Sequence, residues 1–119
     1  MVVGDVQKLD DPGLVRALRA LGDATRFRMV QEIAAGGELC CGEVAERFDV
    51  TQPTISHHLK VLSAAGVLSV RTQGKHRYIS VNQPLLANLV RQLPGRLMRE
   101  HGSGAGRSRE SLRLALRRR

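Results

Sequence analysis

Aromatic side chains are almost missing from this sequence, which contains no tryptophan, one tyrosine and two phenylalanines. The core must therefore be built from aliphatic side chains. No apolar run in the sequence approaches the ~20 residues that a membrane-spanning helix needs. The first residues do not join a basic segment to a long apolar one, as a secretion signal would. We therefore expect a cytoplasmic protein that makes no membrane contact.

The motifs of several enzyme classes are also absent. The sequence has no glycine-rich phosphate loop and no H-E-x-x-H motif. Its two cysteines, Cys40 and Cys41, are adjacent. They form neither the C-x-x-C motif of dithiol reductases nor an ordinary cross-linking disulfide, and they fit a reducing cytoplasm. These absences favour a protein that is not an enzyme, with a thiol-dependent enzyme as a remote alternative.

The positive charge is concentrated at one end of the chain. The 119 residues carry a net charge of +8, of which residues 102–119 hold +5 through six arginines and one glutamate. The remainder is mildly basic, which weakens net charge as an argument for a nucleic-acid partner. We expect residues 1–11 to be a flexible leader, residues 12–98 a single domain and residues 99–119 a flexible arginine-rich tail. Such a tail adds salt-sensitive attraction to DNA.

Residues 51–62 have the pattern of a short amphipathic helix. Thr51 can cap its first turn, because the hydroxyl accepts a hydrogen bond from an otherwise unpaired backbone N–H. Ile55, Leu59 and Leu62 follow at helical spacing and share one apolar stripe. The helix is therefore expected to bury one side and expose the other.

The exposed side of this helix carries groups that can contact DNA. At helical spacing His57 and Lys60 lie opposite the apolar stripe, Ser56 lies on its flank, and Gln52 stands near the helix start. Imidazole, ammonium, hydroxyl and amide groups bind phosphates and base edges. A solvated polar face is the alternative interpretation, so the surrounding elements must decide.

Three further helices are expected before this stretch, over residues 12–21, 23–34 and 42–48, with glycines at their ends. The last of them, a short turn and the helix over residues 51–62 make a helix-turn-helix. The side chains expected to face inward are Phe27, Val30, Ile33 and Ala34 in the second helix and Val44, Ala45 and Phe48 in the third. The first helix has an apolar stripe that must be buried against the domain's own core or against a second copy of the chain: Leu14, Val15, Leu18 and Leu21.

A basic β-hairpin follows the helix-turn-helix. Residues 67–72 and 77–81 alternate between apolar and polar side chains as strands do, and residues 73–76 contain a glycine turn. A hairpin in this position is typical of a wing that contacts the DNA backbone, with a solubilising surface hairpin as the alternative. Its basic side chains are Arg71, Lys75, His76 and Arg77.

The last expected helix runs from residue 83 or 84 to about residue 98, with Asn82 as its cap and Pro94 as a kink or early end. This helix and the first one are too apolar to be left in water, which favours a symmetric homodimer. The expected interface residues are Leu14, Leu18, Leu86, Leu89 and Leu93. The predicted fold class is mainly α with a small β-hairpin, a winged helix-turn-helix that is homodimeric through its first and last helices.

The sequence resembles the ArsR/SmtB family of winged-helix transcriptional repressors. The resemblance is carried by residues 21–28 (L-G-D-A-T-R-F-R), residues 38–40 (E-L-C) and residues 51–62, followed by A-G-V-L at residues 65–68. It implies a homodimer that represses transcription by binding an inverted-repeat operator in double-stranded DNA. It also implies base or phosphate contacts from Gln52, Thr54, Ser56 and His57, and backbone contacts from Lys60, Lys75 and Arg77. The basic hairpin itself adds Arg71 as a further expected DNA contact.

Many members of this family release DNA when they bind a metal or metalloid, but the known ligand patterns are incomplete here. Cys40 matches the first cysteine of the C-x-C thiolate site, whereas Gly42 stands where the second is expected and Cys41 lies between them. Asn82 and Pro84 replace the first two ligands of the site in the last helix. The remaining candidate ligands are Cys40 and Cys41, which can chelate a thiophilic ion only with a third ligand.

Several modes of regulation therefore stay open. One is a response to a transition metal or metalloid ion, with As(III), Ni(II) and Zn(II) as candidates. The others are oxidation of Cys40 and Cys41, a small-molecule effector, or a separate sensory partner protein. A protein-interaction module that binds no nucleic acid is a further alternative, and the basic hairpin argues against it.

Overall fold

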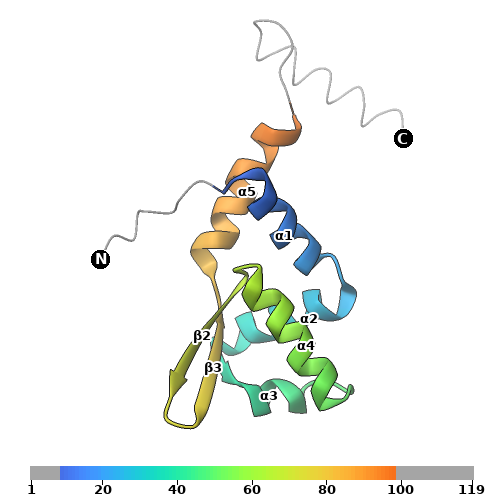
Figure 1. Cartoon of the computed structure of the whole chain (residues 1–119), viewed down its shortest axis with the longest axis vertical. Helices are drawn as coiled ribbons and strands as arrows, with labels where there is room; N and C mark the ends of the chain where they lie inside the picture. The colour runs from blue at the N-terminus through green and yellow to red at the C-terminus, as the bar shows by residue number, and fades with distance from the viewer. Residues whose placement is uncertain (1–8, 99–119) are drawn as a thin grey trace, which may run out of the picture.

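The computed structural model describes residues 9–98, which form five helices and three strands (Figure 1). Most of the predicted leader and all of the predicted tail lie outside the described residues. The helices are α1 (Asp11–Leu21), α2 (Ala24–Gly36), α3 (Cys41–Glu46), α4 (Gln52–Ala64) and α5 (Gln83–Leu97), and the strands are β1 (Glu38–Cys40), β2 (Leu68–Gln73) and β3 (His76–Val81).

The strands form one antiparallel sheet in the order β1-β3-β2. β2 and β3 make the predicted hairpin, which projects away from the helices (Figure 1). Its two-residue turn begins at Gly74, whose φ of 62° is accessible to glycine at little cost. The sequence interpretation missed β1, because three residues are too few to show a strand's alternation. Leu39 of β1 pairs with Ile79 at the centre of β3.

The core lies between α1, α2, α3, α4 and the root of the sheet, and Leu89 of α5 adds to it. The largest fully buried side chains are all aliphatic or methionine: Met29, Ile33, Val44, Ile55, Leu62, Val67 and Ile79. This composition agrees with the shortage of aromatic residues in the sequence. No helix within residues 9–98 is long and apolar enough to cross a membrane.

The buried face of α2 differs from the prediction. Phe27 is 51% exposed and Ala34 is also exposed, whereas Met29 is fully buried. Val30 and Ile33 are buried as expected. The helix is therefore rotated towards Met29. The exposed Phe27 and the exposed Arg28 beside it left the helical periodicity too weak to locate the buried side from sequence alone.

Two local predictions about helix ends also need correction. Thr51 stands at the N-cap of α4, but its side chain caps no backbone N–H and its Oγ1 lies 2.9 Å from Oγ1 of Thr54. Pro94 lies inside α5 and does not end it. Val90, whose carbonyl would accept the bond that proline cannot donate, is 70% exposed, so water can satisfy that carbonyl.

The cap at the start of α5 was predicted correctly, and it also joins distant segments. The side-chain oxygen of Asn82 accepts a hydrogen bond from the backbone N–H of Leu85 at 3.2 Å. Its amide nitrogen donates to the carbonyl of Gly66 at 2.9 Å, at the end of α4. Gly66 has a φ of 84°, and a Cβ there would come within 2.8 Å of Leu85 Cδ1. This junction fixes α5 relative to α4.

Candidate nucleic-acid interface

α4 is held so that one polar side faces solvent. Ile55, Leu59 and Leu62 are 1%, 7% and 0% exposed, as their spacing predicted, and they anchor the helix on the core. On the opposite side His57 and Lys60 are exposed. Because three buried side chains fix the rotation of the helix, the direction of its polar side is fixed too. This is the arrangement that a helix entering a DNA groove requires.

The N-terminal end of α4 presents an exposed side-chain amide and a hydroxyl group that is already hydrogen-bonded. Gln52 is exposed at the first position of the helix. Thr54 is half-buried, and its hydroxyl is hydrogen-bonded to that of Thr51. Of the predicted contacts at this end, Gln52 is therefore the more accessible.

The flank of α4 that faces α1 is used for packing. The Nη1 atom of Arg26 lies 3.4 Å from Nδ1 of His58, and its Nε donates to the carbonyl of Ala20 at 2.8 Å. Arg26 thereby joins the end of α1 to the middle of α4. His58, which follows the exposed His57, serves the fold and not the polar side.

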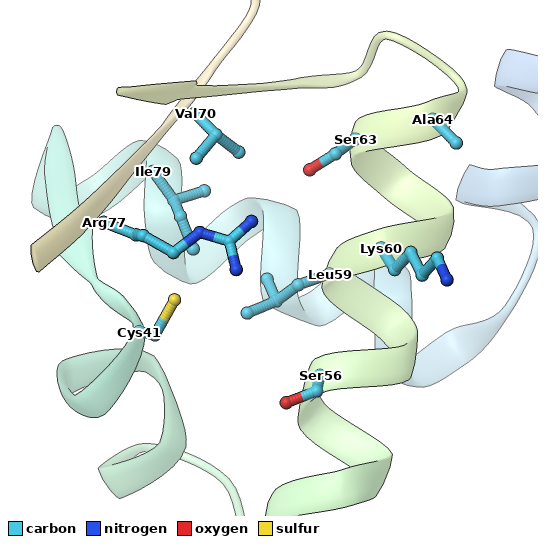
Figure 2. Close-up of a pocket in the computed structure, with 9 residues that line it drawn as sticks. All are labelled: Cys41, Ser56, Leu59, Lys60, Ser63, Ala64, Val70, Arg77 and Ile79. Carbon is cyan, nitrogen blue, oxygen red and sulfur yellow. The ribbon is translucent and has the colours of Figure 1, made fainter. Parts of the chain in front are cut away.

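The hairpin uses its basic residues in three different ways. Arg71 forms a salt bridge with Glu38 of β1, with Nη2 2.8 Å from Oε1, and its guanidinium lies 4.7 Å from the centre of the Tyr78 ring. The hydrogen bond from Arg71 lowers the pKa of Glu38 below its ordinary value, so this bridge is lost only as the pH falls through that lowered pKa. Lys75 is exposed in the turn. Arg77 points towards α4 (Figure 2).

A cleft of about 640 Å³ separates α4 from the hairpin. In Figure 2, Ser56 and Ser63 point into it from α4, and Arg77 points into it from β3. Lys60 lies on the rim, with its ammonium group directed away from Arg77. The predicted DNA contacts thus fall into two groups. His57 and Lys60 face outward, whereas Ser56 and Arg77 point into the cleft from α4 and β3.

Comparison with known proteins agrees with this arrangement. The helix-turn-helix domain family matches residues 21–71. The chain is 36% identical to the transcriptional repressor SdpR of Bacillus subtilis over 72 residues, which cover 60% of this chain and 79% of the relative. It is 30% identical to the arsenical resistance operon repressor of the same organism over 86 residues, which cover 72% of this chain and 82% of the relative.

The chain belongs to the ArsR/SmtB family. A solved structure described as a possible transcriptional regulator for arsenical resistance superimposes with a TM-score of 0.60 at 31% identity, covering 67% of this chain and 82% of that one. The predicted family and the winged helix-turn-helix fold are therefore confirmed. Like its family, this chain is a DNA-binding transcriptional regulator.

The two cysteines of this ArsR/SmtB-family regulator have different surroundings. Cys40 ends β1, and its backbone N–H donates to Glu43 Oε1 at 2.9 Å. Cys41 begins α3 and lines the cleft beside α4. Within residues 9–98, no three His, Cys, Asp or Glu side chains come together as a metal site would require. The donors in this part of the chain therefore do not complete a metal site.

The apolar side chains of α1 and α5 divide between the core and the surface. Leu14 and Leu89, which were predicted in the dimer interface, are only 3% and 5% exposed within the single chain and belong to its core. Leu86 and Leu93 are half-buried, and Leu18 is 40% exposed. The sequence interpretation did not place in the interface the other exposed apolar residues of these helices and their ends: Val15, Val90, Leu97 and Met98.

α1 and α5 are joined to each other at the end of the molecule away from the hairpin (Figure 1). Nε of Arg96 lies 2.8 Å from Oδ1 of Asp11, and the side chain of Gln92 accepts a hydrogen bond from the backbone N–H of Leu9 at 3.1 Å. Leu9 also packs partly against the core. Tertiary contacts therefore begin before residue 12, inside the segment predicted to be a flexible leader.

Proposed function

We propose that this chain binds an inverted-repeat operator as a homodimer and represses transcription. The observation that carries the proposal is the outward-facing polar side of α4, where Gln52, His57 and Lys60 are exposed while three leucine and isoleucine side chains lock the helix. Lys75 at the hairpin turn supplies a charge for the phosphate backbone. This function places the protein in the cytoplasm, where its DNA and its reduced thiols are found.

A homodimer is supported by the apolar surface of α1 and α5. Val15 is 46% exposed, Leu18 40% and Val90 70%, on two helices that are hydrogen-bonded to each other. Large apolar side chains exposed in this way favour association between proteins. A two-fold axis through α1 and α5 would leave both copies of α4 free, and an operator with half-sites about 34 Å apart would match such a dimer.

Regulation without a resident metal site is the form of the proposal that the described residues support best. Cys40 and Cys41 supply two thiols, and within residues 9–98 no three His, Cys, Asp or Glu side chains are arranged to hold a metal ion. One relative is an arsenical resistance operon repressor, so a response to As(III) is an alternative form of regulation. A second copy of the chain would then supply the third ligand. A sensory partner protein and oxidation of the thiols are the other modes.

The recognition role of α4 predicts a loss of sequence-specific binding in two variants. His57→Ala and Gln52→Ala should each weaken binding to an operator selected from random DNA by roughly tenfold, because one base contact contributes about 1–3 kcal/mol. Binding to random DNA should change much less. Fluorescence anisotropy with both DNAs at one salt concentration measures the two effects.

Gln31→Ala is the matched control, because Gln31 is an exposed amide of α2 outside α4 and the hairpin. It should leave both affinities unchanged. Wild-type operator affinity in both His57→Ala and Gln52→Ala would place the base-reading surface elsewhere on the molecule.

Titration with ions tests the form of regulation. Under reducing conditions, As(III), Zn(II), Ni(II) and Cu(I) are expected to leave the operator complex intact, because the described residues do not complete a site. The Cys40→Ser and Cys41→Ser variants serve as controls. Release of DNA by one ion in the wild-type protein, abolished in either cysteine variant, would contradict this expectation and establish a metal sensor that uses both thiols.

A further inference from the structure

The cleft between α4 and the hairpin combines a guanidinium group with apolar walls. Arg77 reaches into it from β3, and Ser56 and Ser63 face Arg77 from α4 (Figure 2). The apolar walls are formed by Leu59, Val70 and Ile79, and Cys41 stands at the end nearest α3. The cleft thus offers hydrogen-bond donors and apolar surface within one enclosure.

The charge of Arg77 is not neutralised by the described part of the chain. Arg47, Arg71 and Arg96 each form a salt bridge with a carboxylate, whereas Arg77 forms none within residues 9–98. None of the nine residues that line the cleft is acidic. A guanidinium group has five N–H donors in a planar fork that matches a carboxylate or a phosphate. The complementary group is therefore an anion.

The walls of the cleft indicate what the anion is attached to. The side chains of Leu59 and Ile79 are buried beneath the cleft, and Val70 is 40% exposed along its edge. Inorganic phosphate or a DNA phosphate would leave the exposed part of Val70 in water. The volume of about 640 Å³ lies within the roughly 300–1,000 Å³ typical of small-molecule sites. An apolar body on the anion would fill the space beside Arg77.

We propose that this cleft binds a small organic anion, a carboxylate or phosphate group carried on an apolar body, with the guanidinium group of Arg77 on the charged group. The regulatory consequence rests on the proposed DNA-binding function. Arg77 is also a predicted DNA contact, so an anion in the cleft and a DNA phosphate compete for the same guanidinium group. Binding of the anion therefore weakens operator binding, and operator binding weakens binding of the anion to the same degree.

Cys41 provides a direct readout that needs no DNA. In a Cys40→Ala chain, neutral iodoacetamide modifies only Cys41, and mass spectrometry gives the rate. Phenyl phosphate, inorganic phosphate and phenol are compared as protecting probes at matched ionic strength. Phenyl phosphate is expected to slow the modification of Cys41 at a concentration at least about tenfold lower than inorganic phosphate or phenol. Only phenyl phosphate can contact both the guanidinium group and the apolar side chains of the cleft.

Three variants in the Cys40→Ala chain assign the protection to the cleft. Arg77→Gln should weaken protection by phenyl phosphate by roughly tenfold or more, since a hydrogen-bonded charge is lost. Arg91→Gln, at an exposed arginine of α5, is the matched control and should change nothing. Val70→Ser should weaken protection by phenyl phosphate and leave that by inorganic phosphate unchanged. A thermal unfolding midpoint verifies the fold of each variant.

Two results would overturn the site. Equal protection by inorganic phosphate and phenyl phosphate would reduce the cleft to a contact for the DNA backbone. Protection that persists in Arg77→Gln would mean that the guanidinium group does not bind the anion.

The regulatory step is tested separately with selected operator DNA. Phenyl phosphate should release the wild-type protein from DNA more effectively than inorganic phosphate at equal ionic strength. If Cys41 is protected but operator affinity is unchanged, the cleft is a binding site and the proposed competition is wrong. If the protein binds no operator at all, the proposed function fails while the measurement at Cys41 still decides the site.

Discussion

Replacing Val90 by glutamate is expected to turn the dimer into a monomer and to lower operator affinity by about two orders of magnitude or more, because a dimer binds both half-sites as one unit. Val90 is 70% exposed on α5, in the apolar surface assigned to the interface. Two-fold symmetry would bring two new carboxylates to that interface, and burying unpaired charges costs several kcal/mol. The change leaves the core of the single chain untouched, so helical circular dichroism should be preserved.

Sedimentation measures the mass of the variant, and anisotropy with a full operator and with a single half-site measures its binding. Half-site binding should survive, because α4 is unchanged. Ala35→Glu supplies the control, since it adds the same charge at an exposed position of α2. A Val90→Glu protein that sediments as a dimer would place the interface outside this part of α5.

A second large effect is expected at Met29, which is fully buried in α2. Met29→Ala should lower the free energy of unfolding by about 3 kcal/mol, within the 2–5 kcal/mol found for such truncations in well-packed cores. Phe27→Ala in the same helix removes a larger side chain, but Phe27 is 51% exposed, so the loss should stay below about 1 kcal/mol. Denaturant titration at one protein concentration compares the two, because dimerisation makes stability depend on concentration.

The two variants test the rotation of α2 directly. Phe27 and Met29 lie on nearly opposite sides of the helix, two residues or about 200° apart. If Phe27→Ala were the more damaging change, the helix would face the core with the side that its sequence periodicity suggested. The measured order therefore distinguishes the observed packing from the sequence prediction.

Elements with strong local patterns were predicted well. Ile55, Leu59 and Leu62 located the buried side of α4, because three apolar residues at helical spacing leave only one rotation that removes them from water. Asn82 was recognised as a cap because capping involves only the next few residues. Capping and turn geometry depend on only a few neighbouring residues, so these parts of the fold could be predicted without any knowledge of packing.

The remaining features depend on partners far away in the sequence. β1 exists because Leu39 pairs with Ile79, and Arg71 is engaged because Glu38 lies beside it across the sheet. Neither partner can be recognised from residues close by in the chain.

Local patterns in the chain were enough to specify the family, the order of the five helices and the hairpin, and the outward side of α4. The packed structure was needed to show that Leu14 and Leu89 belong to the core and that Ser56 and Arg77 line one cleft. The physical reason is that helical or strand periodicity specifies which side of an element is apolar or polar. Which neighbour that side meets depends on how the elements pack, and packing is a property of the whole chain.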